Sequence, residues 1–472
     1  MNRLLRLQTR STKRFYQSWN YPKDVTPETP VFTVTPQNGF LPRVDPVKQL
    51  PPQFEKMNKL LDEMSLTLPN GEPGLLAKGK FGETVERELP LYNVDDITDQ
   101  PLLMGLFRDY TYCASSYLLE PCDIMNRTKG SYGPGREVLP KNIAVPLQKI
   151  SDKIGAKPFM EYAQSYALYN YQRKDPSRPL DYDNLELIRK FSGSKSEHGF
   201  INIHVAMVRH TPALVDAVLK VMDSCHARNH PEFIKNMESL IAVMTKINGV
   251  MEEMWGKSLP EDYGKFRAFI MGTKDQEEMF PKGVIYEGVD ENPRFYRGES
   301  GANDSIIPVC DNLLELTGNM PNNPMTDILK DFRSYRPKDH GKFVEWVEHS
   351  AREIGVKNFC EQNPKSLSLY IQLLDQVRDF RNRHWSFAKE YIIKRSNHPK
   401  ATGGSPMATW LPNQLSVVLD AINQSSDLIA TKFSDHPDQK LIQTIKQRAG
   451  AQKRILDKDV EMFKQKFAGK NI

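Results

Sequence analysis

The stretch that decides the fold is YIQLLDQVRDFRNRHWSFAKEYII, residues 370–393. Its apolar side chains recur close to the 3.6-residue period of an α-helix, at Ile371, Leu374, Val377, Phe387 and Tyr391. This period predicts one long helix whose apolar face packs into the interior of the protein.

His384 falls on the same apolar face, and Arg381 precedes it by nearly one turn. A buried imidazole beside a cation needs a group that satisfies it. Neutral imidazole is the commonest protein ligand for metals, and a metal that carries anionic groups, such as haem with its propionates, would meet both requirements. Taken alone, the helix is explained more simply by a core histidine bonded to a backbone carbonyl, so both interpretations stay open.

Length and charge limit the class of protein. The 472 residues suffice for two or three domains with a substantial core. The net charge of +5 equals the contribution of five residues near the N-terminus: Arg3, Arg6, Arg10, Lys13 and Arg14. The balanced remainder argues against a nucleic-acid-binding face. No apolar run approaches the ~18 residues of a membrane span, so no transmembrane segment is predicted.

Residues 1–20 are rich in arginine, contain serine, threonine and leucine, and carry no acid. This composition is typical of a mitochondrial transit peptide and predicts a location in the mitochondrial matrix. The alternative is a basic tail on a cytoplasmic protein.

The five cysteines are widely spread and form no CxxC pair, which indicates reduced thiols. No CxxCH motif is present, so any haem would be bound without covalent attachment. P-loop, HExxH, GxSxG and strand-linked GxGxxG motifs are also missing. His226 and His230 are four residues apart, but Pro231 is expected to end their helix, which favours a solvated pair over a metal site.

The order of patterns along the chain predicts an all-α fold. Residues 21–150 form a small N-terminal domain with an extended, proline-rich start, and residues 151–472 form a large helical domain. Pro212 predicts a kink or break in the apolar segment 200–222. No internal repeat or strand-rich region is evident.

Seven segments together resemble the indoleamine 2,3-dioxygenase family, particularly its fungal members. They are NGFLP from Asn38, VLPKNIAVP from Val138, RKDPSRPLDYDNLEL from Arg173, FRAFIMG from Phe266, GVIYEGVDENPRFYRGESGANDS from Gly283, RHWSFAKEYI from Arg383 and ATGGSPM from Ala401. The resemblance implies a small domain and a larger helical domain that encloses haem b.

The resemblance also implies the cofactor site. His384 matches the proximal iron ligand, and Arg381 matches an arginine at a haem propionate. Ser300 and Gly301, followed by Ala302, match a turn of small residues at the haem edge, where a bulky side chain would collide with the macrocycle.

The substrate site follows in the same way. Arg267 matches the arginine that holds the substrate carboxylate, a task that suits a planar, permanently charged guanidinium. Tyr162 and Phe200 match aromatic residues around the indole. Thr402 and Gly403 match a mobile loop that closes over the substrate, with Thr402 near its ammonium group.

Three positions depart from the family pattern. His204 stands where mammalian members carry serine, and it could hydrogen-bond indole or oxygen, narrow the pocket or coordinate the iron; with Arg267 it is the candidate catalytic residue. Asp262–Tyr263 replaces an aromatic pair, which leaves Tyr263 as the substrate-binding ring and Asp262 as an acid that would disfavour the substrate. Ser165 replaces a cysteine-type pocket residue.

The implied activity is the O2-dependent cleavage of the indole C2–C3 bond of L-tryptophan to N-formylkynurenine, the first step of the kynurenine route to NAD, by a monomeric enzyme. One alternative is a haem protein of the same fold with weak or different indole activity, acting as a sensor or non-catalytic binder. Another is a helical interaction module without a cofactor.

Overall fold

The computed structural model describes residues 16–22, 24–316, 324–396, 398 and 400–467. Helices dominate these residues, which confirms the all-α prediction. Strands among them are confined to two short ribbons. In the first, β1 (Val138–Leu139) pairs in parallel with β4 (Ile285–Tyr286). In the second, β2 (Tyr171–Arg173) pairs antiparallel with β3 (Leu185–Leu187).

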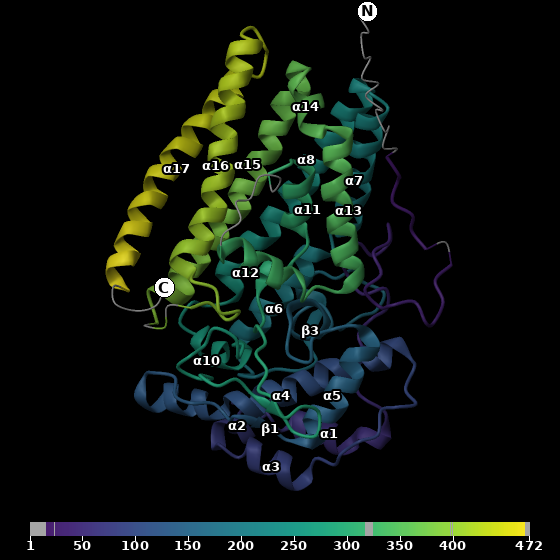
Figure 1. The fold of residues 1–472 in the computed structure, drawn as a ribbon, viewed down its shortest axis with the longest axis vertical. Helices are drawn as coiled ribbons and strands as arrows, with labels where there is room; N and C mark the ends of the chain where they lie inside the picture. The colour runs from purple at the N-terminus through teal and green to yellow at the C-terminus, as the bar shows by residue number, and fades with distance from the viewer. Residues whose placement is uncertain (1–15, 23, 317–323, 397, 399, 468–472) are drawn as a thin grey trace, which may run out of the picture.

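The first helices form the lower layer of Figure 1. They are α1 (Glu55–Asp62), α2 (Leu75–Lys78), α3 (Phe81–Glu88), α4 (Gln100–Lys129) and α5 (Lys141–Ile154). The proposed domain boundary at residue 150 lies inside α5, which packs along α4.

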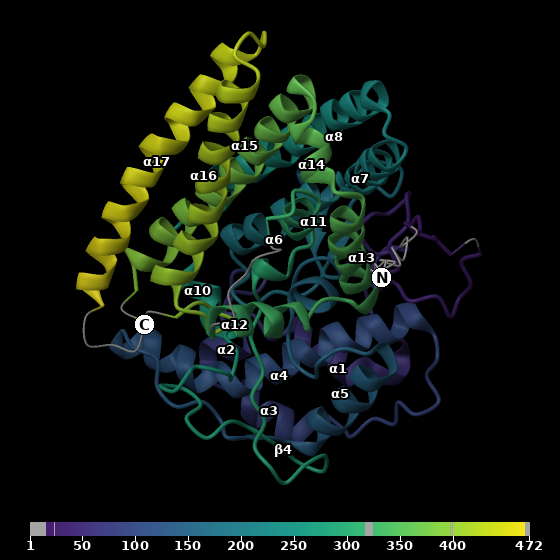
Figure 2. The same ribbon diagram turned by 45° about the horizontal axis from the view of Figure 1, so that its top comes forward.

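The remaining helices form a bundle that stands on this layer, and the two views agree on the arrangement (Figures 1 and 2). They are α6 (Lys195–Val208), α7 (Thr211–His226), α8 (His230–Glu252), α9 (Met254–Lys257), α10 (Gly264–Arg267), α11 (Ile306–Leu313), α12 (Pro324–Arg333), α13 (Lys338–Ile354), α14 (Val356–Glu361), α15 (Pro364–Phe387), α16 (Met407–Lys432) and α17 (Gln439–Lys466). Short 3-10 or π turns lie at η1 (Pro52–Phe54), η2 (Tyr162–Tyr166), η3 (Tyr182–Asn184), η4 (Ala268–Ile270), η5 (Gly301–Asn303) and η6 (Ala388–Ile393).

Helix α15 is the central helix of the bundle and contains most of the stretch that opened the sequence analysis. The side chain of Asn363 caps its first turn by accepting the N–H of Ser366 at 3.0 Å, and Pro364 fits the first helical position. Its apolar face packs between α8 and α16. The helix continues into the π-helix η6, so the predicted helical run to Ile393 is confirmed.

Two prolines mark helix boundaries. Pro212 lies in the first turn of α7, and α6 ends at Val208, which confirms the predicted break. Pro231 begins α8 and does not end a helix, so His226 and His230 belong to different helices. The prediction that Pro231 is a terminator was wrong, because proline is favoured in a first turn, where its missing N–H has no helical partner.

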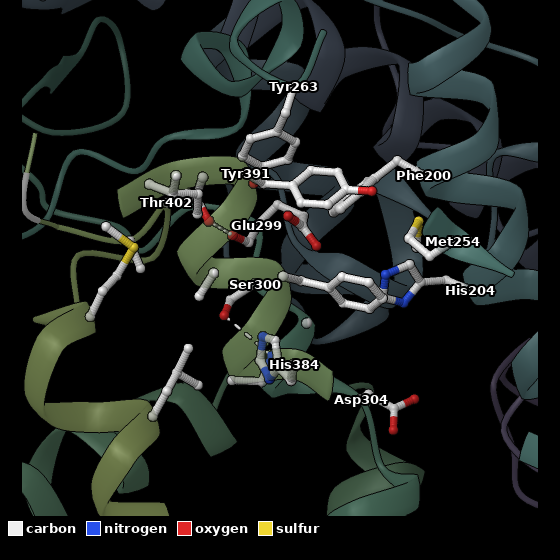
Figure 3. A pocket seen from close by; sticks show the side chains of 18 of the residues that line it. Phe200, His204, Met254, Tyr263, Glu299, Ser300, Asp304, His384, Tyr391 and Thr402 are labelled. Carbon is white, nitrogen blue, oxygen red and sulfur yellow. Dashed lines mark hydrogen bonds between the residues drawn. The ribbon is translucent and has the colours of Figure 1, made fainter. Parts of the chain in front are cut away.

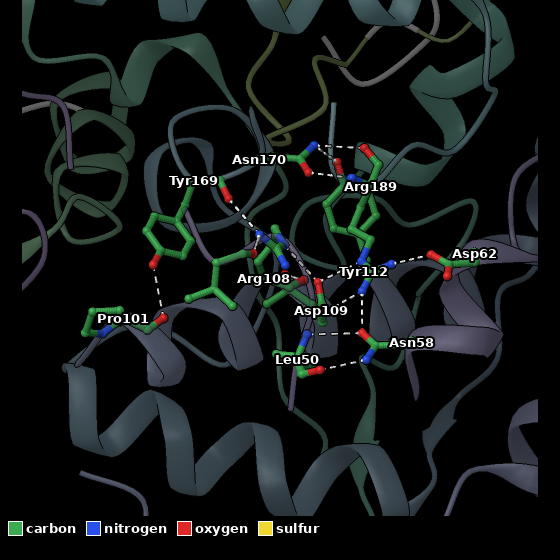
Figure 4. Close-up of polar contacts among 12 residues, drawn as sticks. Leu50, Asn58, Asp62, Pro101, Arg108, Asp109, Tyr112, Tyr169, Asn170 and Arg189 are labelled. Atoms are coloured by element: carbon green, nitrogen blue, oxygen red, sulfur yellow. Dashed lines mark hydrogen bonds and ion pairs between the residues drawn. The ribbon is translucent and has the colours of Figure 1, made fainter. Parts of the chain in front are cut away.

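A buried ion-pair network fixes the segment after β3 to the lower layer (Figure 4). Asp109 of α4 accepts hydrogen bonds from Arg108 at 2.8 Å and from Arg189 at 3.0 and 2.8 Å. Arg189 also reaches Asp62 of α1 at 2.8 Å. Burial alone would raise the pKa of the Asp109 carboxyl, but the two guanidinium groups outweigh it and the pKa is lowered. The carboxylate therefore stays ionised inside the protein.

The chain upstream of the proline-rich region lies against the bundle. The hydroxyl of Tyr16 donates to Asp223 of α7 at 3.1 Å, and Trp346 of α13 donates to the carbonyl of Gln17 at 3.0 Å. The rings of Trp19 and Phe343 meet edge to face at 5.1 Å. The end of the proposed transit peptide at residue 20 therefore falls within a docked segment, while residues 1–15 lie outside the described residues. Across the described part of the chain, no helix combines the length and the apolar character that a membrane crossing requires.

Candidate functional site

A large cavity lies beside the C-terminal half of α15 (Figure 3). It spans about 1050 Å³ including the open space at its mouth. Its walls come from α6, α15, η6, the turn at residues 299–304 and the loop at residues 401–407. Segments distant in the sequence therefore meet around one apolar space.

His384 faces this cavity from the last turn of α15. No described group forms a hydrogen bond with its ring, so the interpretation as a core histidine bonded to a backbone carbonyl finds no support there. Burial, and then the charge of Arg381, lower the pKa of His384 to about 4. The ring is neutral at pH 7, the form in which imidazole binds metals.

A second cavity of about 770 Å³ shares His384, Gly301 and Ala302 with the first and has a basic end. Arg333, Arg336 and Arg381 line that end together with Asp304 and Asp311. Arg381 pairs with Asp311 at 2.6 Å. Arginines outnumber acids here, so the end suits anionic groups.

Arg333 and Arg336 were not identified from the sequence. Arg336 is buried and donates to the carbonyl oxygens of Ala302 and Asn303 at 3.0 and 3.2 Å. Burial and the nearby Arg333 lower its pKa to about 10, so the guanidinium remains charged at pH 7. Nothing in the sequence pattern links these residues to His384.

The turn at Ser300 and Gly301 leaves room between the two cavities. The hydroxyl of Ser300 accepts the N–H of Ala302 at 3.3 Å and caps η5. A Cβ atom added at Gly301 would meet no atom closer than Cε1 of His204, at 3.8 Å. A free imidazole, apolar walls, open space at Gly301 and a basic end fit a flat, apolar macrocycle with two carboxylates, which is the chemistry of haem.

The other side of the cavity is aromatic. Phe200 and Tyr263 line it, with ring centroids 5.3 Å apart, and His204 lies beside them. Tyr162, predicted as a pocket residue, stands behind His204 and is only 1% exposed. Its hydroxyl lies 3.3 Å from Nδ1 of His204. The imidazole at position 204 thus separates Tyr162 from the cavity.

Burial lowers the pKa of His204 to about 4, with a smaller contribution from His384. Its ring is therefore neutral at pH 7. Burial raises the pKa of the Tyr162 phenol well above 10, so this group keeps its proton. Its hydroxyl contacts both Nδ1 of His204 and the carboxyl group of Asp304, so the direction of the Tyr162–His204 bond depends on the tautomer of His204.

Asp262 does not face the cavity, contrary to the expectation that it would disfavour the substrate. Its carboxylate accepts hydrogen bonds from Ser196 and Lys265, each at 2.6 Å. These two partners satisfy the acid outside the cavity, and Tyr263 alone of the pair faces inward.

Arg267 does not line the cavity that contains His384. It is 2% exposed and lines a neighbouring cavity, and Tyr391 lies on the wall of both. Nη2 donates to the carbonyl of Lys400 at 2.7 Å, and Nε is buried without a hydrogen-bond partner. The guanidinium therefore retains capacity for an anionic ligand one aromatic ring away from the main cavity.

The loop that follows Lys400 covers one side of the cavity. Thr402 lines it and donates to the carbonyl of Glu299 at 2.6 Å. Gly403 does not line the cavity, and its carbonyl accepts a hydrogen bond from Arg297 at 2.8 Å. Gly404 has φ +85°, and an added Cβ would lie 2.5 Å from the carbonyl oxygen of Lys274. Only glycine fits that position. The role of the loop as a lid stays a prediction.

Glu299 is the cavity residue that the sequence analysis missed. It is 4% exposed and lines the cavity, and its carboxyl group has no hydrogen-bond or ion-pair partner among the described residues. Burial, and then Glu161, raise its pKa to about 8. An acid within the small-residue run GESGA was the available signal.

We predict that Glu299→Gln raises the melting temperature of the substrate-free protein at pH 8 by roughly 2 °C or more. An unfolded glutamate ionises near pH ~4.3. Folded Glu299 holds its proton to about pH 8, so wild-type stability falls as the pH rises between these values. Glutamine does not titrate, so the difference between the two proteins should shrink towards pH 5.

Thermal melts at pH 5 and pH 8 check this prediction, and Glu161 is the charged neighbour that both proteins share. The exposed Glu291→Gln is the matched control and should change neither melt. If Glu299→Gln melted at a lower temperature than the wild type at pH 8, the carboxyl group would have a stabilising partner. That result would contradict the prediction.

Comparison with known proteins identifies the family. The family model for indoleamine 2,3-dioxygenase matches residues 28–438. Indoleamine 2,3-dioxygenase 1 of Rattus norvegicus is 26% identical over 70% of this chain and 78% of its own length. Indoleamine 2,3-dioxygenase of Saccharomyces cerevisiae is 24% identical over 79% of this chain and 82% of its own. A 6-hydroxytryptophan 2,3-dioxygenase of Fusarium equiseti is 23% identical over 81% and 89%. Matched over most of its length and built around the cavity beside His384, the chain belongs to the indoleamine 2,3-dioxygenase family of oxidoreductases.

Proposed function

We propose that this protein is a haem-dependent dioxygenase that cleaves the indole C2–C3 bond of L-tryptophan with O2 to give N-formylkynurenine. The observation that carries the proposal is His384, an unpartnered neutral imidazole in a cavity with apolar walls and a basic end. Membership of the family supports it.

The residues around the cavity would bind haem without a covalent bond. Nε2 or Nδ1 of His384 would ligate the iron, and Arg381, Arg336 and Arg333 would pair with the propionates. The five cysteines are buried, and none lines either cavity. When bound, haem supplies the redox chemistry that allows dioxygen to react with an aromatic double bond.

The chain itself positions the substrate and excludes water. Phe200, Tyr263 and Tyr391 offer flat apolar surfaces that suit an indole. Arg267, next to the cavity, would hold the carboxylate, and the loop at Thr402 would cover the bound amino acid. No side-chain base is needed in this scheme, so the contribution of the protein is orientation and a dry environment.

His204 would hold a proton close to the reacting atoms. In the tautomer in which Nδ1 accepts from Tyr162, the Nε2–H group would donate to an oxygen atom in the cavity. The same pair fixes the ring orientation. A ligating role of His204 on the iron is the competing arrangement.

A second candidate is a dioxygenase of the same fold that acts on a different indole. His204 and Glu299 are among the polar side chains that line this cavity, and they favour a substrate with polar substituents. The name of the Fusarium equiseti relative states that it acts on 6-hydroxytryptophan.

Absorption spectra of the purified protein, ferric and ferrous, with and without L-tryptophan, test cofactor, ligation and substrate together. We expect a Soret band that shifts with tryptophan, and N-formylkynurenine from the reduced protein under O2. Full haem loading with product only from another indole would favour the second candidate. A protein that takes up no haem would contradict both.

A further inference from the structure

We infer that Glu299 binds the α-ammonium group of the substrate. This inference rests on the proposed function and deepens it, because it names the residue that would distinguish ligands with a free amine from ligands without one. It is carried by the burial, the missing partner and the surroundings of one carboxyl group.

The carboxyl group of Glu299 lies in the interior of the cavity (Figure 3). Most buried carboxylates are paired, because an isolated buried charge is strongly disfavoured. Asp109 in this chain follows that rule through Arg108 and Arg189. Glu299 has no such partner among the described residues and holds its proton in the free protein, and a cationic ligand would supply the charge that lets it ionise.

Three aromatic rings line the cavity together with this carboxyl group (Figure 3). The ring of Tyr263 lies 5.3 Å from that of Phe200 and 5.8 Å from that of Tyr391, between ring centroids. All three line the cavity together with Glu299. Aromatic rings and an acid in one cavity suit a cation, because ring quadrupole and carboxylate both attract positive charge. An alkylammonium group is the cation that an indole amino acid carries.

The backbone holds Glu299 in this orientation. Its N–H donates to the carbonyl of Ile270 at 3.1 Å, and its carbonyl accepts the hydroxyl of Thr402 at 2.6 Å. The preceding Gly298 packs so closely that an added Cβ would lie 2.3 Å from the backbone nitrogen of Gly272. The carboxyl group is therefore presented from a fixed turn.

Arg267 and Glu299 lie in adjoining cavities. Glu299 and Tyr263 line the main cavity, Arg267 lines the neighbouring one, and Tyr391 lies on the wall of both. A zwitterionic amino acid would place its carboxylate towards Arg267 and its ammonium towards Glu299, which fixes one orientation of the indole.

Three ligands distinguish the contribution of the ammonium group from that of the carboxylate. L-Tryptophan carries both, tryptamine carries only the ammonium, and indole-3-propionate carries only the carboxylate. Spectral titration of the ferric, haem-loaded protein with each ligand gives three dissociation constants. We expect Glu299→Gln to raise the dissociation constants of L-tryptophan and tryptamine about tenfold or more, since hydrogen bonds to charged groups contribute that much to binding. Indole-3-propionate should bind within about twofold of the wild type.

Glu291→Gln is the control. Glu291 is an exposed glutamate that does not line the cavity. This variant should keep the wild-type ratio between the three dissociation constants. The Soret band of each variant reports whether its site is intact.

Equal weakening of all three ligands by Glu299→Gln, or no weakening of L-tryptophan and tryptamine, would overturn the inference. These results differ from a failure of the proposed function, in which the wild-type protein itself forms no product and binds no indole. A wild type that turns over tryptophan beside an unaffected variant refutes only the role of Glu299.

Discussion

Replacing His384 by alanine should abolish the Soret band of the purified protein and lower dioxygenase turnover by at least about a hundredfold. Residues that merely orient a metal ligand contribute ten- to hundredfold, and loss of the ligand itself should exceed that. The protein should still fold, because the imidazole lies at a cavity and has no described hydrogen-bond partner to lose. Haem content per chain and the absorption spectrum measure the effect.

Added imidazole sharpens this experiment. His384→Gly leaves space for a free imidazole, which should restore the Soret band without a covalent link to the chain. His204→Ala is the control, since it removes the second histidine of the same cavity and should retain haem. The assignment fails if His384→Ala keeps the wild-type spectrum while His204→Ala loses it.

The second large effect is expected at Gly301. Gly301→Leu should lower the haem content at least about tenfold while the helical fold and melting temperature of the haem-free protein are kept. The added side chain finds open space in the haem-free protein, where the nearest atom to a Cβ is 3.8 Å away. That space is the one a macrocycle would occupy, and overpacking such a site costs about 1–3 kcal/mol or more.

Gly249→Leu is the matched control, because an added Cβ there meets no atom within 4 Å and lies on the exposed surface of α8. Circular dichroism and haem titration should show two folded variants, of which only Gly249→Leu binds haem fully. Normal haem uptake by Gly301→Leu would show that the macrocycle does not occupy the space beside Gly301.

The central helix could be predicted because its information is local. The 3.6-residue period at residues 370–393 and the break at Pro212 depend on neighbours within a few turns, and both are confirmed. His384 was ambiguous in the sequence, because whether an imidazole has a partner depends on what other segments bring to it.

The features that the sequence did not reveal arise from tertiary contacts. Arg333 and Arg336 reach the cavity from a segment about fifty residues before His384. Tyr162 is buried behind His204 and does not line the cavity, and Arg267 lines the adjoining cavity. Glu299 is conspicuous only once the missing partner of its carboxyl group is known.

The docked segment at Tyr16, Gln17 and Trp19 has a consequence for maturation of the protein. A peptidase that cut after residue 20 would remove the aromatic and hydrogen-bonding neighbours of Trp346 and Phe343. The cut would expose an apolar patch on the bundle. A cut upstream of Tyr16 would keep these contacts, so the mature chain would begin with an N-terminal segment that is docked on the helical bundle.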